Sequence, residues 1–287
     1  MLDLDAAAGG LTRVQPSEAQ TTRTLIIDQV GSTNREALAL ADAGCRAPLW
    51  LMARRQTAGR GRADRQWVSA AGNLHASLLL QLDSPPTAVA QLSLLAGVAT
   101  IDAVRAATAG GPHGLRLKWP NDVLVGSAKC AGILVETTSS LPHAGDRPAP
   151  SLALAVIGVG IDLAWHPTGM HRAATDLAAH GCCVSPEMML GSLDDAMRHW
   201  LAMWNGGRGF AAVRQGWLER AGPVGEMCTV DTGRERIEGA FAGLDPSGAL
   251  IICDRHGQRR TVTFGDVALA AAAVAPEAPP SPPKKAS

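Results

Sequence analysis

The chain has 287 residues, and its 26 lysines and arginines balance 26 aspartates and glutamates, so the formal net charge is zero. A chain of this length can bury an ample core in one large domain, or in a large and a small one, without disulfide or metal staples. The balanced charge excludes a general field that would attract nucleic acid or an anionic membrane, so any anion site must be local.

Strand and helix patterns alternate through the first two thirds of the chain. A strand is expected at residues 25–30, followed by a helix at 32–43 that Gly44 closes, with Thr33 and Glu36 as a capping box. Apolar periodicity predicts the remaining elements. The expected strands are 49–56, 74–82, 115–119, 123–125, 130–137 and 152–163, and the expected helices are 87–109, 186–204 and 210–221. Residues 126–127 favour a hairpin turn, and 139–150 a loop.

After Gly222 the pattern changes to short strands divided by glycine turns, at residues 226–231, 234–244, 249–254 and 258–264. A small barrel appended to an α+β core is the simplest interpretation. We therefore divide the chain into four parts, which are an N-terminal extension (1–23), the core (24–222), the barrel (223–270) and a disordered tail rich in Pro, Ala and Lys (271–287).

Cysteine usage and the apolar runs bear on location. The six cysteines show no paired Cys-x-x-Cys spacing, which argues against a zinc knuckle or a secreted disulfide framework. The N-terminus is acidic where a signal peptide needs a basic region. The apolar runs, such as 152–161, are about half of the roughly 20 residues that a membrane helix requires. We expect a cytoplasmic protein with no membrane partner.

The sequence Gln-Thr-Ala-Gly-Arg-Gly-Arg follows the second expected strand and places arginines in a loop of small residues. Gly59 and Gly61 allow successive N–H groups to turn toward one point, while Arg60 and Arg62 add permanent charge with forked donors. Together with Arg65 they form a local cationic cluster that suits a phosphate, a carboxylate or both. A turn with solvated arginines is the simpler interpretation of this loop taken alone.

Other segments also have simple structural explanations. In Lys-Trp-Pro-Asn-Asp, Lys118 ends a strand, and Asn121 and Asp122 follow as an Asx-type turn. Lys129 begins the next strand and could be an ordinary edge lysine.

Two further segments could serve packing or a ligand. Ser32, Thr33 and Asn34 read as helix caps, although a helix N-terminus also presents partial positive charge to a ligand. Gly158 and Gly160 in a strand permit close packing, or let a ligand lie against the backbone.

In order and spacing, these segments together resemble the biotin protein ligases, from about residue 24 to 269. The matching parts are Gly-Ser-Thr-Asn at 31–34, the arginine loop at 56–62 with Trp67, Lys-Trp-Pro-Asn-Asp at 118–122, Lys-Cys-Ala-Gly-Ile-Leu-Val-Glu at 129–136, and Gly-Val-Gly-Ile at 158–161. The resemblance implies a core like that of class II aminoacyl-tRNA synthetases with a mixed β-sheet, plus a C-terminal SH3-like β-barrel. It also implies that ATP and Mg²⁺ activate biotin to biotinyl-5′-AMP. The biotin then passes to a lysine of the biotin carboxyl carrier domain of a biotin-dependent carboxylase.

The resemblance assigns site residues by position. It places biotin against Ser32, Thr33, Asn34, Gln56, Gly59, Arg60, Gly61, Arg62, Lys129, Gly132, Gly158 and Gly160. It places ATP against Arg60, Arg62, Arg65, Lys118, Asn121, Asp122, Lys129 and Asp162. Arg62, Lys129, Lys118 and Asp122 are the expected catalytic residues, and no metal ligands are assigned.

The chemistry explains the need for cations. A carboxylate must approach the α-phosphate of ATP, and two unit charges about 4 Å apart repel by roughly 4 kcal/mol at an effective dielectric near 20. Cations neutralise this approach, so no protein nucleophile is required. We hypothesise that Lys129 bridges the biotin carboxylate and the α-phosphate, and that Arg62 orders the loop over the intermediate. Asp122 could position Mg²⁺ or the incoming lysine amine.

Three acidic residues depart from the family pattern. Asp64 replaces a usual glycine, Asp162 a common asparagine and Asp176 a common serine. An ionised aspartate lacks the N–H₂ donor of asparagine, so the contact with the nucleotide at Asp162 is in doubt and reduced activity is possible.

Other functions stay open. Lipoate protein ligase shares the fold and the adenylation chemistry, and a non-catalytic biotin-binding regulator would also fit the acidic replacements. About two dozen residues precede the core, too few for the DNA-binding winged helix of some relatives, so we expect a short form without a DNA partner. A homodimer is possible.

Overall fold

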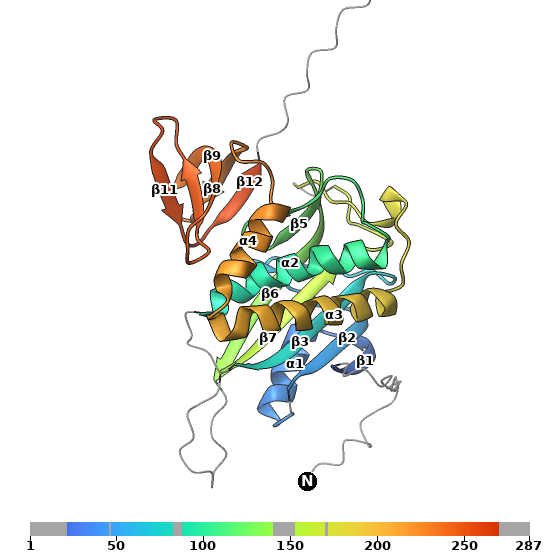
Figure 1. Cartoon of the computed structure of the whole chain (residues 1–287). Coiled ribbons are helices and arrows are strands. Elements are labelled where there is room, and N and C mark those ends of the chain that lie inside the picture. Colours follow the sequence, from blue (N-terminus) through green and yellow to red (C-terminus); the bar gives the residue numbers. More distant parts are fainter. Residues whose placement is uncertain (1–21, 46, 83–87, 140–152, 170–171, 270–287) are drawn as a thin grey trace, which may run out of the picture.

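The computed structural model describes residues 22–45, 47–82, 88–139, 153–169 and 172–269 (Figure 1). The helices are α1 (Thr33–Asp42), α2 (Val89–Ala107), α3 (Pro186–Trp204) and α4 (Phe210–Arg220). The strands are β1 (Arg23–Val30), β2 (Leu49–Gln56), β3 (Leu74–Leu82), β4 (Leu115–Lys118), β5 (Asp122–Val125), β6 (Ala128–Ser139), β7 (Ala153–Ile161), β8 (Met227–Asp231), β9 (Arg236–Leu244), β10 (Leu250–Cys253), β11 (Arg259–Val262) and β12 (Asp266–Leu269).

Within these residues, the strands form two sheets. The larger has the order β1-β2-β3-β7-β6-β5-β4, and in it β1 and β2 run parallel while all other neighbours are antiparallel. The smaller sheet is antiparallel, with the order β11-β10-β9-β8-β12. The expected α+β class, with a mixed core sheet and a second all-β part, is confirmed.

Helices α2, α3 and α4 cover one face of the larger sheet (Figure 1). Helix α2 carries 11 buried residues, among them Leu92, Leu95 and Ile101, and it joins the main hydrophobic core with Ile157 and Val159 of β7. Burial of apolar surface on this scale is the main stabilising term of the fold. Helix α2 is long and apolar enough to cross a membrane, which the search for apolar runs missed, but it is mostly buried in this core.

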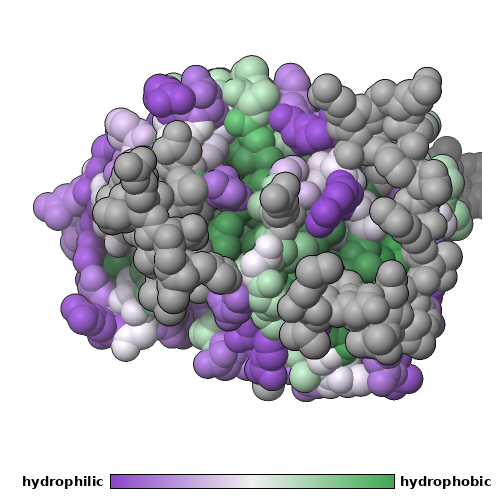
Figure 2. Space-filling model, turned by 90° about the horizontal axis from the view of Figure 1, so that it is seen from below, coloured by the Kyte–Doolittle hydropathy of each residue, from purple (hydrophilic) through white to green (hydrophobic). Residues whose placement is uncertain are grey.

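Helix α1 covers part of the opposite face. Its Ala37 and Ala41 pack with Leu49, Leu79 and Val156 in a separate hydrophobic cluster. Beyond this cluster, no helix of the described residues covers the sheet face, and the candidate site lies there. Seen from below, the hydrophobic residues of the described segments gather toward the middle of the visible face, and hydrophilic residues lie mostly around its rim (Figure 2).

Two local predictions need correction. The capping box at Thr33 and Glu36 does not form, because Ser32 is the N-cap and makes no side-chain capping bond. Instead, Gln56 Oε1 accepts a hydrogen bond of 2.8 Å from the backbone N–H of Thr33. Strand β12 was not expected; it completes the smaller sheet beside β8.

The remaining element boundaries agree within a few residues. The strand expected at 234–244 begins at Arg236, and the helix expected at 87–109 spans Val89–Ala107. The expectations for residues 140–150, for residues 1–21 and for the C-terminal tail lie outside the described residues.

Candidate functional site

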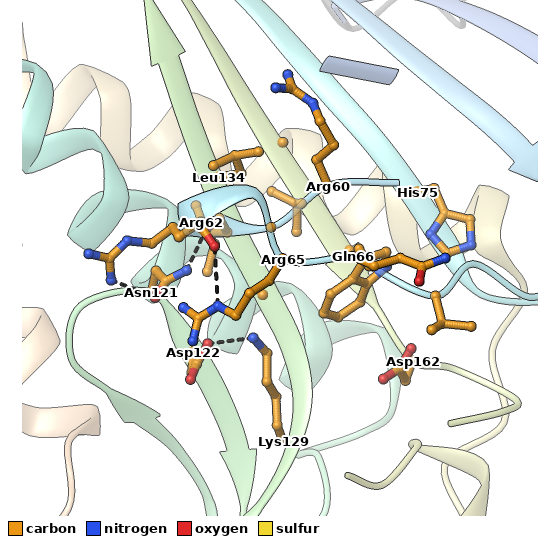
Figure 3. Close-up of a pocket in the computed structure, with 18 of the residues that line it drawn as sticks. Arg60, Arg62, Arg65, Gln66, His75, Asn121, Asp122, Lys129, Leu134 and Asp162 are labelled. Carbon is orange, nitrogen blue, oxygen red and sulfur yellow. Dashed lines mark hydrogen bonds and ion pairs between the residues drawn. The ribbon is translucent and has the colours of Figure 1, made fainter. Parts of the chain in front are cut away.

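Three rows of residues cross β6, β7 and β3 on the face that α1 partly covers. Register pairs Gly132 with Gly160 and His75 in the first row, Leu134 with Gly158 and Ser77 in the second, and Glu136 with Val156 and Leu79 in the third. Antiparallel partners share one face of a sheet. Val156 and Leu79 lie under α1, whereas the glycines leave the first two rows open. A cavity of about 540 Å³ lies over them (Figure 3).

The two glycines of β7 are explained by what lies against them. A Cβ at Gly158 would collide with Asn34 Oδ1, and a Cβ at Gly160 would lie 2.7 Å from the ring of Trp67. Both glycines therefore permit the close packing of a polar or an aromatic side chain on the sheet, which is one of the two interpretations of these glycines.

A β-bulge brings Lys129 into the cavity. The pairing of β5 with β6 shifts by one residue, so that Val123 opposes Ala131 while Leu124 opposes Lys129, which leaves Cys130 as the extra residue. An extra residue reverses which face the following side chains occupy. Lys129 therefore shares the face of Asp122, and its Nζ also lies 5.3 Å from the centre of the Trp67 ring.

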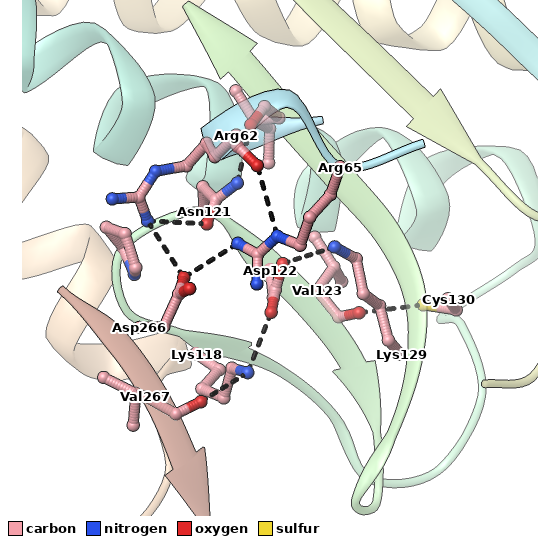
Figure 4. Close-up of polar contacts among 12 residues, drawn as sticks. Arg62, Arg65, Lys118, Asn121, Asp122, Val123, Lys129, Cys130, Asp266 and Val267 are labelled. Carbon is pink, nitrogen blue, oxygen red and sulfur yellow. Dashed lines mark hydrogen bonds and ion pairs between the residues drawn. The ribbon is translucent and has the colours of Figure 1, made fainter. Parts of the chain in front are cut away.

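Asp122 is buried between two lysines (Figure 4). Its carboxylate lies 2.5 Å from Lys129 Nζ and 2.8 Å from Lys118 Nζ. Burial alone would raise the pKa of Asp122, but the charges and hydrogen bonds of Lys129 and Lys118 outweigh it and hold that pKa well below its usual range. Burial lowers the pKa of Lys118, and Asp122 opposes this shift.

A segment of the C-terminal barrel contacts the arginine loop. We name residues 264–267 the barrel strap. Arg62 Nη1 donates to Asn121 Oδ1 at 3.3 Å and to the carbonyl oxygen of Gly265 at 3.4 Å, and its guanidinium lies 5.5 Å from the ring centre of Phe264. Arg65 donates to Asp266 at 2.8 Å (Figure 4).

The strap also contacts the lysine that was assigned to the nucleotide. Lys118 Nζ donates to the carbonyl oxygen of Val267 at 2.9 Å. The strap thus contacts three of the predicted cations, Arg62, Arg65 and Lys118, and brings them together in one cluster.

Arg60 lies apart from this cluster. Its Nη2 donates to both carboxylate oxygens of Glu136, at 2.7 and 2.9 Å, and its side chain points away from Lys129 in the close-up (Figure 3). Its Nε is buried without a hydrogen-bond partner among the described residues. The structure therefore places Arg60 at the end of the cavity near α1, not at the cluster of Arg62 and Arg65.

The end of the cavity near α1 is polar but carries no unpaired charge in the described residues that line it. Ser32 and Thr33 are buried there. Gln56, the first residue of the arginine loop, accepts from the backbone N–H of Thr33, and its Nε2 donates to Ser69 Oγ at 2.9 Å. Gly59 lies under this contact, since a Cβ there would meet the Trp67 carbonyl oxygen and Gln56. The predicted biotin residues at this end are therefore close together.

Asp162 lines the far side of the cavity, where it is 3% exposed. Asn73 Nδ2 donates to its Oδ1 at 3.0 Å, whereas the neighbouring Asp176 contacts His166 at 2.6 Å. Burial raises the pKa of Asp162 to about 8, and Asp176 adds to the shift while Lys129 opposes it. The raised pKa favours the protonated carboxyl of Asp162, which can donate a hydrogen bond, as an asparagine would.

Asp64 has a backbone explanation. Ala63 and Asp64 adopt φ angles of +52° and +53°, in the left-handed region that glycine and, less readily, aspartate occupy. The Asp64 side chain is exposed, and no ion pair to it occurs within the described part of the chain. Aspartate in place of the usual glycine at position 64 therefore keeps the turn, and its carboxylate lies in solvent.

Several residues in the cavity or in contact with its lining were not assigned from the sequence. Trp67 was quoted only as part of a motif, and His75, Asn73 and Glu136 were not assigned to the site. Strand alternation could have found His75, which shares a row with Gly160. The barrel strap has no local signal, because its contacts span about two hundred residues of chain.

The chain was compared with known proteins. Residues 27–145 match the family model described as "Biotin/lipoate A/B protein ligase family", and residues 224–269 match "Biotin protein ligase C terminal domain". The chain is 38% identical to a biotin--[acetyl-CoA-carboxylase] ligase of Paracoccus denitrificans over 82% of this chain and 95% of that protein. The chain belongs to the biotin protein ligase family.

Other members of the biotin protein ligase family support this assignment. A biotin--[acetyl-CoA-carboxylase] ligase of Mycobacterium tuberculosis is 31% identical over 84% of this chain and 87% of that protein. The biotin protein ligase of Aquifex aeolicus, solved in complex with biotin and ATP, superposes with a TM-score of 0.70 at 24% identity, covering 87% of this chain and 99% of that one. The expected fold of the core is confirmed.

The donor groups in the cavity do not form a cage for a divalent cation. Among the described residues there is no group of three His, Cys, Asp or Glu side chains that could hold a metal. Both oxygens of Asp122 contact lysines. Mg²⁺ prefers substrate phosphates and water to all-protein cages, so it fits this site as part of MgATP.

Proposed function

We propose that this protein is an ATP-dependent biotin protein ligase that forms biotinyl-5′-AMP and transfers biotin to a lysine of the carrier domain of acetyl-CoA carboxylase. The observation that supports this proposal most directly is one cavity with two chemically different ends. One end is polar at Ser32, Thr33 and Gln56, and the charge of Arg60 there is balanced by Glu136. The other end presents Lys129, which Asp122 holds together with Lys118 beside the cavity. An uncharged head group and a reacting carboxylate of one ligand match these ends.

In the first step, a carboxylate oxygen of biotin attacks the α-phosphorus of MgATP, and the bond to pyrophosphate breaks. We infer that Lys129 contacts both anions, and the bulge that directs it into the cavity beside Trp67 supports this role. Arg62 and Arg65 supply charge from the loop. Positioned cations that neutralise developing charge are the main source of rate enhancement in phosphoryl and nucleotidyl transfer.

In the second step, the deprotonated lysine amine of the carrier attacks the acyl carbon, an amide forms and AMP leaves. Asp122 had two candidate roles, to position Mg²⁺ or this amine. Its contacts with Lys118 and Lys129 support a third role, which is to hold both lysines in place. Breaking a buried ion pair by removing one partner costs about 3–5 kcal/mol, so this arrangement is stiff.

The cellular setting follows from the same proposal. ATP and a carboxylase are cytoplasmic, and all six cysteines are free thiols, as a reducing compartment requires. For oligomerisation, β1 lies at one end of the larger sheet and could pair with a second copy. Light scattering of the purified protein distinguishes a monomer from such a homodimer.

Incorporation of labelled biotin into a purified carrier domain, with and without ATP, tests the proposal. We expect ATP-dependent labelling of one lysine and release of pyrophosphate. Labelling with lipoate in place of biotin would identify a lipoate ligase, and biotin binding without labelling would identify a regulator. The match of the C-terminal part to a biotin-specific domain favours the first outcome.

A further inference from the structure

One arginine of the cavity differs from the other cations at the reacting end. Asp122 pairs with both lysines of that end, and Asp266 lies beside both arginines of the loop. Arg172 lines the same cavity and is exposed. In the described part of the chain its side chain makes neither an ion pair nor a hydrogen bond. Its charge is therefore available to an anionic ligand.

The segment that carries Arg172 is bonded to the backbone of Lys129. The N–H of Lys129 donates to the carbonyl oxygen of Ala173, and the N–H of Thr175 donates to the carbonyl oxygen of Lys129, both at 2.9 Å. These bonds form a parallel bridge between Lys129 and Ala174. Arg172 lies two residues before Ala174, so extended backbone places both on the face that lines the cavity.

The charge of Arg172 acts on two groups beside the barrel strap or within it. Burial lowers the pKa of Lys118, and the charge of Arg172 adds to this shift. Burial opposes the lowering of the pKa of Asp266, which Arg65, by a hydrogen bond and by charge, and Arg172, by charge, help to produce. Arg172 therefore adds its charge to the cationic cluster at the strap.

The order of residues along β6 gives a direction across the cavity. Glu136 lies in the row under α1, Gly132 lies in the first row, and Lys129 lies next to the bulge. Arg172 lies beyond Lys129 in this order, because the bridge places it beside the residues that precede Lys129. Attacking and leaving oxygens at a transferring phosphorus are roughly in line. A carboxylate that approaches from the α1 end therefore expels pyrophosphate toward Arg172.

We propose that Arg172 binds the terminal phosphates of ATP and the pyrophosphate that leaves. The inference rests on the proposed function and adds a residue that the resemblance to the family did not assign. A carboxylate oxygen of biotin bonds to the α-phosphorus, the bond from phosphorus to the bridging oxygen breaks, and its electron pair leaves with pyrophosphate. Arg172 keeps its proton throughout, and its forked N–H groups suit two phosphate oxygens at once.

The test compares the full-length wild type with R172Q, R172K and a matched control, R105Q. Arg105 is an exposed arginine in the last turn of α2, outside the cavity. Adenylate formation is measured at varied concentrations of ATP, biotin and added pyrophosphate. Transfer of biotin from preformed biotinyl-adenylate to a carrier domain is measured separately.

For R172Q we expect the KM for ATP and the inhibition constant of pyrophosphate each to rise on the order of tenfold, with the KM for biotin unchanged. Transfer from preformed adenylate should keep the wild-type rate, because pyrophosphate has already left. R172K should recover part of the loss, since a lysine binds phosphate as a point charge. R105Q should match the wild type in every measurement.

Wild-type values of both constants in R172Q would overturn the inference. A defect confined to transfer from preformed adenylate would also overturn it, since Arg172 would then act on the carrier. If R172Q fails to fold, R172M decides in the same way. A wild type that forms no adenylate would overturn the proposed function alone, and calorimetric titration of the same proteins with MgATP and with pyrophosphate would then test Arg172.

Discussion

Ion pairs hold three cations at one end of the site or the other. Glu136 holds Arg60 at the uncharged end, and Asp122 holds Lys118 and Lys129 at the reacting end. Free side chains of lysine and arginine lose about 2 kcal/mol of rotamer entropy when they become ordered. Because these pairs order the cations before substrate binds, less of that cost falls on the bound state.

Lys129→Ala tests the reacting end. We expect the rate of biotinyl-adenylate formation to fall by about 10²–10³-fold in a pyrophosphate-release assay, because the variant lacks the cation that contacts both anions. Lys129→Arg keeps the charge and should recover part of the rate. Formation of adenylate at the wild-type rate by the alanine variant would remove Lys129 from the mechanism.

The raised pKa of Asp162 predicts that the free energy of unfolding depends on pH. Its pKa of about 8 in the folded protein lies above the value of about 3.9 for an unfolded chain. The protonated form is therefore favoured by folding, and its contribution is complete below about pH 4 and lost as pH rises toward 8. Relative to Asp162→Asn, the wild type should lose up to about 1.4 kcal/mol of unfolding free energy per pH unit across this window.

Urea denaturation of both proteins at pH 5, 6, 7 and 8 measures this difference, and the asparagine variant serves as the non-titrating reference. Parallel stability curves for the two proteins would mean that Asp162 is ionised in the folded state. An ionised Asp162 would lack the hydrogen-bond donor that an asparagine offers to the nucleotide.

At the scale of elements, the position of the site is set by helix α1. The helix covers the third row of residues on the sheet face, and the cavity lies over the other two rows. The sequence predicted β2, β3 and α3 with the observed bounds, because their apolar patterns are long and regular. It could not place Glu136 beside Asn34, since their contact spans about a hundred residues and depends on register. It also missed the acceptor role of Gln56 at the start of α1, where a tertiary contact replaces the local cap.

Gly158→Ala tests the close approach of Asn34 to β7. The added methyl group would collide with Asn34 Oδ1, so we expect a loss of about 1–3 kcal/mol of unfolding free energy together with a higher KM for biotin. Gly191→Ala is the control, because that glycine lies exposed in α3 with open space around it. The control should be neutral or stabilised by up to about 1 kcal/mol in thermal unfolding. Equal stability of the two variants would refute the close-packing explanation.

At the scale of the whole molecule, the reacting end is built from both sheets. The barrel strap lies beside Arg62 and Arg65, and it also binds Lys118 of the core. The sequence indicated a separate all-β part, but nothing in it showed that this part reaches the arginine loop. The order of the loop therefore depends on how the barrel packs on the core.

Arg62→Gly and Asp266→Asn test this dependence. We expect Arg62→Gly to retain the adenylate more weakly and to label lysines indiscriminately on added bystander proteins. Asp266→Asn leaves the charge of Arg62 in place but removes an ionic contact of the loop, so the same leakage should appear in weaker form. Retention times of labelled biotinyl-adenylate on the enzyme measure both effects, and wild-type retention by Arg62→Gly would refute its role as a lid.

The bulge at Cys130 makes the length of β6 as important as its composition. Exchange of Cys130 for another small apolar residue keeps the extra position and therefore the orientation of Lys129. Loss of that one position would restore regular pairing and turn the lysine to the opposite face, among the apolar side chains below α2. In an alignment of β6, a gap is therefore a more serious difference than a mismatch. When activity is predicted for distant relatives, the positions of gaps in this strand should be checked first.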